Sequence, residues 1–257
     1  TMQPSDTDLL RFSRFLLAPE VSEESLEQVR GSTAAVVGLG GLGCPVALYL
    51  AAAGVGRLRL IDPDTVEVSN LPRQVLFGPN HTGHNKAVAA AEQLQLLHPH
   101  AQIEAFNEAV TAANAASLFM GSDIVIDCTD RFASRHIVNQ ACHRLRLPLV
   151  IGSALQWSGQ LLVVDPRQNH SGCYACLFPQ GGEGSSVVDA ACGAYGVVST
   201  AVGLVGLMQA NEALKLLMGR PAPTGQLWQF EARSLSLESM RFQARKGCLV
   251  CGGLGKK

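Results

Sequence analysis

The sequence predicts an α/β fold in which a mostly parallel sheet is covered by helices on both faces. Short apolar runs alternate with helical patterns through residues 33–151, an order that is typical of such sheets. A glycine-rich loop follows the first apolar run. The chain has 257 residues, of which 47% are hydrophobic, so it can bury a substantial core. Linker signals are weak, and we expect one domain over residues 1–257.

The first half of the chain alternates strand and helix patterns. Residues 4–30 are polar and amphipathic and predict helix and loop ahead of the first strand. We expect strands at Ala34–Val37, Leu58–Ile61, Ile103–Phe106, Ile124–Ile126 and Leu149–Ile151, and helices at Cys44–Ala53, Asn85–Leu97 and Ala133–Leu145.

The second half has a different pattern. Strand-like segments at Gln160–Asp165, Gln226–Glu231 and Arg241–Gln243 predict additional, antiparallel C-terminal strands. A long apolar helix is expected over Ala194–Met218. Residues 180–186 lack apolar anchors and predict a mobile loop.

The charge balance excludes bulk attraction to nucleic acid or to a membrane surface. The chain carries 20 Lys and Arg against 21 Asp and Glu, a net charge of −1. Thr33–Gly56 is uncharged, but it holds Pro45 and alternates strand and helix signals, and Val197–Met208 is too short to span a bilayer. The N-terminus lacks the layout of a signal peptide, so we expect a cytoplasmic protein.

The glycine-rich loop fits a dinucleotide-binding, Rossmann-like arrangement. Gly38, Gly40, Gly41 and Gly43 form G-x-G-x-x-G between a predicted strand and a predicted helix. Such glycines let phosphates approach backbone N–H groups at a helix N-terminus. Asp62 ends the second strand, where an acidic side chain can bind ribose hydroxyls. The motif leaves NAD, FAD and ATP open, and the absence of G-x-x-x-x-G-K-[ST] argues against a P-loop.

Four cysteines form two C-x-x-C pairs, Cys173 with Cys176 and Cys248 with Cys251. Four thiolates suit tetrahedral Zn²⁺ in a closed structural site. Such a zinc clasp would join the C-terminal residues to the domain and would stabilise it rather than catalyse. A single pair could instead be a redox motif of the thioredoxin type.

Three polar side chains near predicted strand or helix ends have the chemistry of a phosphate site. Arg73 and Lys86 supply cations, and Asp130 supplies a carboxylate for Mg²⁺. Each also has a plain structural interpretation: Arg73 as a surface ion-pair partner, Lys86 as a solvated helix residue, and Asp130 as a cap of the following helix.

Cys192 belongs to neither C-x-x-C pair and lies beside the expected mobile loop. It is a candidate nucleophile or sulfur-handling thiol, and the alternative is a small buried residue before the long helix. Cys44, Cys128 and Cys142 fall within apparent strands and helices, and we interpret them as structural.

Together these residues resemble the MoeB/ThiF family, the bacterial relatives of ubiquitin-activating E1 enzymes. The resemblance covers nearly the whole chain in order. It is carried by Arg11–Arg14, Gly38–Gly43, Ala53–Gly56, Asp62, Ser69–Gln74, Asp127–Asp130, both C-x-x-C pairs and Gln209–Leu214.

The resemblance implies an ATP-dependent adenylyltransferase, a nucleotidyltransferase that acts on a small ubiquitin-like sulfur-carrier protein. Its Gly-Gly carboxylate would attack the α-phosphate of ATP, release pyrophosphate and become ready to accept sulfur. The implied parts of the single adenylation domain are an N-terminal helical segment (1–30), a nucleotide-binding half (31–152) and a carrier-binding and zinc-clasp half (153–257).

The resemblance also implies roles for individual residues. Gly41 would approach the phosphates and Asp62 the ribose, while Asp130 would hold Mg²⁺. The phosphates would be bound by Asn70, Arg73 and Lys86, and Ser69 would also contact the nucleotide. Arg14 looks like the arginine that family members supply across a homodimer interface. Neither nucleic acid nor membrane is an expected partner.

The chain departs from the family pattern at three positions. Phe15 and Pro72 stand where relatives usually carry Gln, and Arg131 stands where Asn is usual. Arg131 would either add a phosphate contact or weaken the metal site beside it. No rhodanese-like segment follows Cys251, so we expect a separate sulfur donor. The role of Cys192 stays open.

Two other functions remain at this point. An NAD- or FAD-dependent oxidoreductase would use the same glycine loop, but it leaves Arg73, Asp130 and the paired cysteines without a joint explanation. A non-catalytic, zinc-stapled scaffold for a ubiquitin-like partner is the other.

Overall fold

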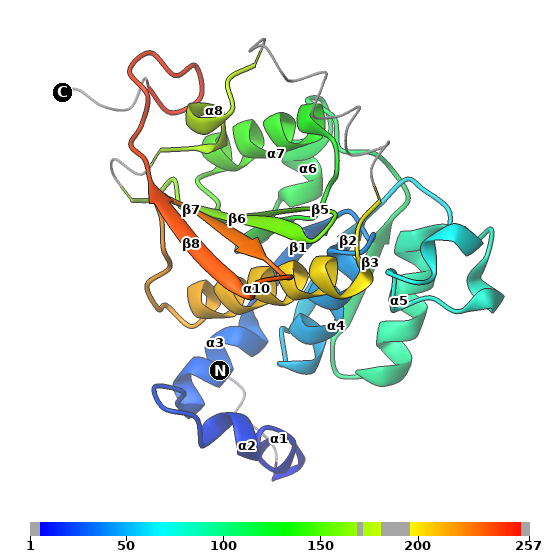
Figure 1. Cartoon of the computed structure of the whole chain (residues 1–257). Helices are drawn as coiled ribbons and strands as arrows, with labels where there is room; N and C mark the ends of the chain where they lie inside the picture. Colours follow the sequence, from blue (N-terminus) through cyan, green and yellow to red (C-terminus); the bar gives the residue numbers. More distant parts are fainter. Residues whose placement is uncertain (1–5, 169–171, 181–195, 253–257) are drawn as a thin grey trace.

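One eight-stranded sheet runs through the protein, in the order β3-β2-β1-β4-β5-β6-β7-β8 (Figure 1). The computed structural model describes residues 6–168, 172–180 and 196–252. The sheet is mostly parallel and continues into antiparallel strands, which confirms the predicted fold class. The expected loop at residues 180–186 lies outside the described residues from residue 181 onward.

The first five strands are parallel and form one side of the sheet, with β3 at its edge. They are β1 (Thr33–Val37), β2 (Arg57–Ile61), β3 (Gln102–Phe106), β4 (Ile124–Asp127) and β5 (Leu149–Leu155). Every residue of β1 and β4 is buried, as expected for strands covered on both faces. Val37 pairs with both Ile61 and Asp127, so β1, β2 and β4 end at one edge of the sheet.

The last three strands, β6 (Ser158–Val164), β7 (Gln226–Glu231) and β8 (Ser236–Arg241), are antiparallel. The expected strand at Arg241–Gln243 is therefore wrong, since β8 ends at Arg241. A tight turn is the reason. Leu235 adopts a φ of 52°, and Ser236 returns directly opposite Glu231.

Helices cover both faces of the sheet (Figure 1). One face carries α3 (Glu23–Gly31), α4 (Gly43–Ala52), α5 (Lys86–Leu97) and α10 (Ser199–Leu217). The other carries α6 (Ala115–Phe119), α7 (Phe132–Leu145) and α8 (Tyr174–Leu177). Two short 3₁₀ helices, η1 (Val68–Asn70) and η2 (Pro79–His81), lie between β2 and α5.

The long helix α10 starts later than the sequence pattern predicts. It begins at Ser199 rather than Ala194 because Val197 forms a parallel bridge with Gln156. The backbone N–H of Val198 also donates to the carbonyl of Gln156 at 2.9 Å. Residues 194 and 195 lie outside the described part.

The N-terminal arm consists of α1 (Asp6–Arg11) and α2 (Ser13–Leu16). Phe12 anchors it, with 3% of its surface exposed. Its ring lies where a Cβ on Gly54 would be, 2.8 Å from Cζ, and Gly54 has a φ of +94°. A glycine is thus required at the turn before β2.

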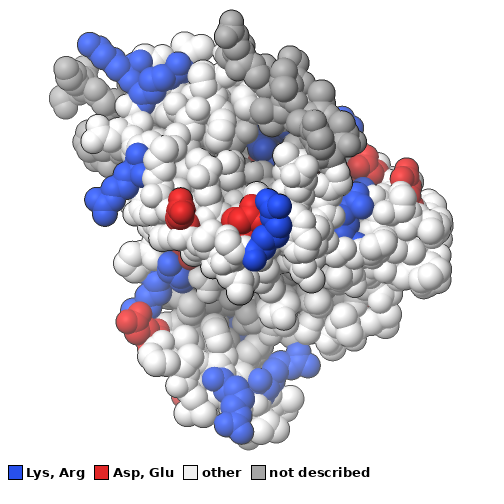
Figure 2. Space-filling model, viewed as in Figure 1, with Lys and Arg blue, Asp and Glu red and all other residues white. Residues whose placement is uncertain are grey.

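None of the helices in the described ranges combines the length and apolar composition that a membrane span requires. On the face drawn in Figure 2, Lys and Arg side chains are scattered among Asp and Glu side chains. They form no single basic patch on that face, which agrees with the balanced charge of the chain.

Candidate functional site

The glycine-rich loop joins β1 to α4 at the carboxyl edge of the sheet. Gly38 has a φ of +90°, and a Cβ there would lie 2.9 Å from the carbonyl oxygen of Cys128. A Cβ on Gly43 would lie 1.8 Å from the carbonyl oxygen of Gly38, so this position must be glycine. Gly40 meets only the Gln74 side chain at 3.8 Å, an ordinary contact. The fold therefore requires glycine at residues 38 and 43, but it would accept a larger side chain at residue 40.

Asp62 follows β2 and holds this loop. Its Oδ2 accepts the backbone N–H of Leu39 at 2.6 Å, and its Oδ1 accepts that of Asp64 at 2.8 Å. Burial raises the pKa of Asp62, while these two N–H groups and the charge of Lys86 oppose the rise. The structure therefore places the predicted ribose-binding carboxylate against the predicted phosphate loop.

Lys86 starts α5 and is buried, which contradicts its interpretation as a solvated helix residue. Its Nζ lies 3.2 Å from Oδ2 of Asp64. Asn85 caps the helix, its Oδ1 accepting the N–H of Val88 at 3.1 Å, and its Nδ2 donates to the carbonyl of Asp62. These bonds hold the ammonium of Lys86 beside the loop after β2.

Arg73 lies on the segment after η1. Its Nη2 donates to Oδ1 of Asn70 at 2.9 Å and its Nη1 to the carbonyl of Ser69 at 3.3 Å. No ion pair of Arg73 is found within the described ranges, so the surface ion-pair interpretation is not supported. A Cβ on Gly41 would lie 3.4 Å from Cγ of Arg73, which brings this side chain to the glycine loop.

Asp130 lies on the loop between β4 and α7. Its side chain is exposed, and it makes no hydrogen bond or ion pair with a described residue. The N-cap position of α7 is Arg131, without a side-chain cap bond, so Asp130 does not cap this helix. Arg131, the next residue, is exposed as well, so a positive side chain stands beside the Asp130 carboxylate in the sequence.

Asp127, three residues earlier, is fully buried. Its Oδ1 accepts both the backbone N–H and the hydroxyl of Thr129, at 2.9 and 2.7 Å. Its Oδ2 has no hydrogen-bond partner among the described residues. Burial raises the pKa of Asp127, and nearby Arg135 acts in the opposite direction. The buried carboxyl group of Asp127 thus fixes Thr129, the residue before Asp130.

Two residues that sequence reasoning did not assign to the site hold the same loop. Arg135, buried in α7, donates from Nη2 to the carbonyl of Thr129 at 2.8 Å. Gln209, fully buried in α10, donates from Nε2 to the carbonyl of Asp127 at 2.8 Å. Their partners are backbone carbonyls, which leave no sequence signal. The only hint was the inclusion of Gln209 in the family-like run at 209–214.

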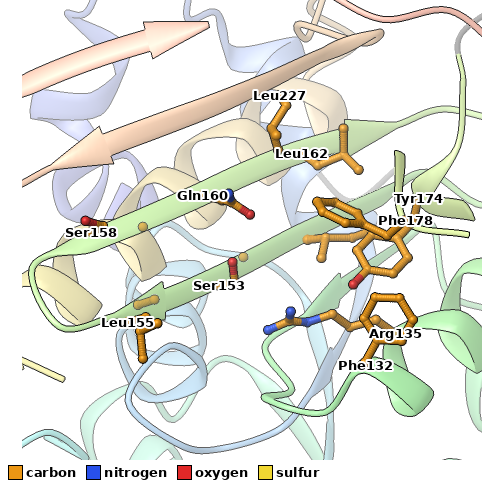
Figure 3. A pocket seen from close by; sticks show the side chains of 14 residues that line it. Phe132, Arg135, Ser153, Leu155, Ser158, Gln160, Leu162, Tyr174, Phe178 and Leu227 are labelled. Carbon is orange, nitrogen blue, oxygen red and sulfur yellow. The ribbon is translucent and has the colours of Figure 1, made fainter. Parts of the chain in front are cut away.

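A cavity of about 310 Å³ lies between the β5–β6 hairpin and helices α7 and α8 (Figure 3). Aromatic rings of Phe132, Tyr174 and Phe178 form one end. Arg135 reaches in from α7, and Ser153 projects from β5 (Figure 3). The cavity therefore has apolar walls, a buried cation, and direct continuity with the Asp130 loop through Arg135.

The four C-x-x-C cysteines come together, as the sequence predicts. Their Sγ atoms all lie within 4.8 Å of one another. Cys173 is 3.9 Å from Cys176 and 3.7 Å from Cys248, and Cys176 is 3.2 Å from Cys251. Tetrahedral Zn–S bonds of about 2.3 Å separate sulfurs by about 3.8 Å, so the set fits one zinc ion.

The electrostatics of this cluster differ from one thiol to another. Burial raises the pKa of Cys173 to about 11, partly offset by the Asn139 side chain. For Cys248, burial alone would raise the pKa, but backbone N–H groups of Cys251 and Val250 outweigh it and lower the pKa to about 7. These two thiols therefore have different electrostatic surroundings although their sulfurs lie 3.7 Å apart.

The remaining cysteines separate into three buried thiols and one position outside the described residues. Cys44, Cys128 and Cys142 are buried, as expected for structural thiols, and burial raises the pKa of Cys44 to about 12. Cys192 lies outside the described residues.

Arg14 lies apart from the other predicted site residues within one chain. It is exposed on α2, in the arm that Phe12 anchors against Gly54. Gly54 precedes β2, so the arm sits at the amino end of that strand, whereas Asp62 follows its carboxyl end.

The ThiF family model matches residues 12–250 of this chain. The chain belongs to the ThiF family. The sulfur carrier protein ThiS adenylyltransferase of Escherichia coli K12 is 39% identical to this ThiF-family chain over 249 residues, with 97% of each covered. The adenylyltransferase and sulfurtransferase MOCS3 of Drosophila yakuba is also 39% identical; the chain spans about half of it, 54%.

Solved structures share the fold at lower identity. E. coli MccB with ATP superposes with a TM-score of 0.83 at 20% identity, covering 97% of this chain and 76% of MccB. E. coli MccB with AMPCPP and selenomethionine MccA gives 0.84 at 20%, covering 97% and 75%. At this identity the likeness shows the fold alone.

Proposed function

We propose that this ThiF-family chain uses ATP to adenylate the C-terminal Gly-Gly carboxylate of a small ubiquitin-like sulfur-carrier protein, with release of pyrophosphate. One observation carries the proposal. The carboxyl edge of the sheet brings together the glycine loop, Asp62, Arg73 and Lys86, with Asp130 on the neighbouring loop. The similarity to a ThiS adenylyltransferase over 97% of both chains supports a carrier protein as the substrate.

ATP would lie across this edge of the sheet. Backbone N–H groups of Gly40–Gly43, at the N-terminus of α4, would face the phosphates, while the N–H groups of Gly38 and Leu39 are bonded within the fold. Each carboxylate oxygen of Asp62 already accepts one backbone N–H, and each keeps a second lone pair that can accept a ribose hydroxyl. Asn70 and the carbonyl of Ser69 orient the guanidinium of Arg73, whose other N–H groups remain for phosphate.

Asp130 fits a magnesium ligand by its chemistry and its surroundings. It is an exposed carboxylate without a protein partner among the described residues, directly beyond a buried strand end. Mg²⁺ bound there would neutralise phosphate charge during nucleotidyl transfer. Arg131 stands beside it, and we assign this extra cation to phosphate binding.

The reaction joins two anions, so the chain must offset repulsion. A carboxylate oxygen of the carrier attacks the α-phosphorus, the bond to the β-phosphate oxygen breaks, and pyrophosphate leaves. Arg73 and Lys86 hold positive charge where the phosphates lie, and fixed charges of this kind need no reorganisation. Arg14 is too remote to act within its own chain, so we propose that a second copy supplies it in a homodimer.

The cavity of Figure 3 suits the tail that carries the attacking carboxylate. Its apolar walls accept an extended, uncharged segment, and Arg135 holds the end of the cavity next to the Asp130 loop. The whole chain would act as one adenylation domain, with nucleotide bound by residues 31–152 and carrier by residues 153–257.

Zinc in the four-cysteine centre would be structural. Four thiolates fill all four tetrahedral positions, which leaves none for a substrate. Sulfur would then reach the adenylated carrier from a separate donor, with Cys192 as the candidate thiol of this chain. We place the enzyme in the cytoplasm, where a reduced thiol centre persists.

ATP–pyrophosphate exchange tests the proposal. Purified protein should incorporate labelled pyrophosphate into ATP only with a Gly-Gly-ending carrier, and a carrier lacking its last glycine serves as the control. Exchange that never depends on any carrier tail, or reduction of bound NAD or FAD by a substrate, would contradict it.

A further inference from the structure

Asn139 lies in the middle of α7 and contacts the first C-x-x-C turn. Its side chain is fully buried. Its Oδ1 accepts a hydrogen bond from the backbone N–H of Tyr174 at 3.2 Å. Tyr174 directly follows Cys173, so this bond fixes the backbone that presents the Cys173 sulfur.

The other half of the Asn139 amide, Nδ2, has no hydrogen-bond partner among the described residues. This nitrogen is buried. Buried donors are rarely left in this state, since an unmade hydrogen bond costs stability. Cys173 directly precedes Tyr174, whose N–H binds the Oδ1 of the same amide, so its sulfur is the candidate acceptor for this donor.

Aromatic rings pack α7 against the turn that Asn139 binds. Tyr174 packs against His136, the ring centroids 5.1 Å apart, and His136 packs against Phe132 at 4.6 Å. These rings pack α7 against α8, and His136 lies three residues before Asn139, on the same face of the helix. One turn earlier, Arg135 binds the carbonyl of Thr129, which fixes the amino end of the helix.

We propose that Asn139 is a positioning residue of the four-cysteine metal centre: its Oδ1 holds the Cys173–Cys176 turn, and its Nδ2 donates to the Cys173 thiolate. Contacts of this kind orient metal ligands and typically change metal affinity by about 10- to 100-fold when removed. The inference rests on the metal site of the proposed function and does not depend on adenylation.

An amide-to-acid pair of variants tests the inference. Asn139→Asp keeps an oxygen for the Tyr174 N–H but replaces the Nδ2 donor with a second oxygen, which repels the thiolate. Gln140→Glu makes the same chemical change one residue further on, where the side chain is exposed. Each zinc-loaded protein is mixed with the chromogenic chelator 4-(2-pyridylazo)resorcinol, and the rate of metal transfer is measured.

We expect zinc to leave Asn139→Asp about 10- to 100-fold faster than the wild type, and Gln140→Glu to match the wild type. Cobalt substitution gives a second readout. The Co²⁺ absorption bands report the ligand field, so they should shift in Asn139→Asp and stay unchanged in Gln140→Glu. Equal release rates and equal spectra in both variants would overturn the role of Asn139.

A charge buried at residue 139 can prevent folding, so Asn139→Ala, which adds none, is measured in parallel. It loses both contacts, and faster metal release is expected again. If neither variant folds with excess zinc while metal-free wild type does, Asn139 acts independently of the metal and the inference fails. Wild-type protein that takes up no zinc would instead overturn the metal site itself.

Discussion

Asp62 and Leu39 are joined by a hydrogen bond of 2.6 Å from the Leu39 N–H to the Asp62 carboxylate, just beyond the paired ends of β1 and β2. The acidic residue that the motif assigns to the ribose is therefore also a structural anchor of the glycine loop. Loss of Asp62 should affect folding and nucleotide binding together, and the two effects can be separated.

Asp62→Ala should lower the free energy of unfolding by about 1–3 kcal/mol for each buried N–H left unpaired. Asp62→Asn keeps one accepting oxygen and should lose less stability, while both variants bind ATP more weakly. Urea unfolding and titration with a fluorescent ATP analogue measure the two quantities. If Asp62→Ala had the same unfolding free energy as the wild type, the bonds to Leu39 and Asp64 would contribute nothing to stability.

The glycines of the loop should respond differently to alanine. A Cβ at Gly43 would overlap the Gly38 carbonyl, so Gly43→Ala should unfold the start of α4 or yield insoluble protein. A Cβ at Gly40 meets only the Gln74 side chain, so Gly40→Ala should fold normally. If ATP approaches this loop, Gly40→Ala should nevertheless weaken ATP binding, by about tenfold or more.

Circular dichroism and ATP-analogue titration compare the two glycine variants. A folded Gly43→Ala protein would contradict the loop geometry. A folded Gly40→Ala protein with unchanged affinity would place the phosphates elsewhere.

The sequence predicted the parallel part of the fold well because its strands are short, continuous apolar runs between helical patterns. β1 and β4 are buried throughout, and such runs are local signals. The pattern failed where structure depends on distant partners or short elements. β8 is an exposed edge strand with no clean apolar face, and α8 has only four residues, too few for a helical period.

The same distinction applies to the candidate site. The cysteine pairs, Asp62 and the glycine loop have fixed spacings and could be found from the sequence. Arg135 and Gln209 could not, because they hold backbone carbonyls of a loop from other elements. Gln209 reaches Asp127 across 82 residues of sequence. Asn139 likewise binds a backbone N–H, 35 residues further on.

Asp127 should make the stability of the protein depend on pH. Burial raises its pKa above the ordinary value of 3.8, so the folded chain holds this proton more tightly than the unfolded chain does. Between 3.8 and the raised pKa, unfolding releases the proton. The contribution of this group to the unfolding free energy therefore falls as pH rises, by up to about 1.4 kcal/mol per pH unit.

Asp127→Asn should remove that slope. Its Oδ1 still accepts the two bonds from Thr129, and its amide replaces an oxygen that has no partner among the described residues. The stability of the variant relative to wild type should rise through this pH window and then level off. Urea unfolding at a series of pH values measures it, and parallel curves would contradict a raised pKa.

Removal of metal from the four-cysteine centre should destabilise the protein. The centre ties Cys248 and Cys251, beyond the last strand, to the turn that begins at Cys173. We expect the Tm to fall by more than about 5 °C after chelation, since 1 kcal/mol shifts Tm by about 2–4 °C in a protein of this size. Calorimetry before and after verified zinc removal measures this. An unchanged Tm would remove the stabilising role.

Asp130→Ala should abolish carrier-dependent ATP–pyrophosphate exchange and leave the protein folded. The side chain is exposed and has no partner among the described residues, so its loss breaks no contact of the fold. The reaction, however, would lose its ligand for Mg²⁺, and removal of one such charge-stabilising group costs about 10²–10³ in rate.

Arg131→Ala removes the neighbouring charge and should raise the KM for ATP more than it lowers kcat. Unfolding and light scattering verify the state of both variants. Near-normal exchange by Asp130→Ala would exclude this carboxylate from the mechanism and direct attention to Asp127, the buried carboxyl group at the end of β4.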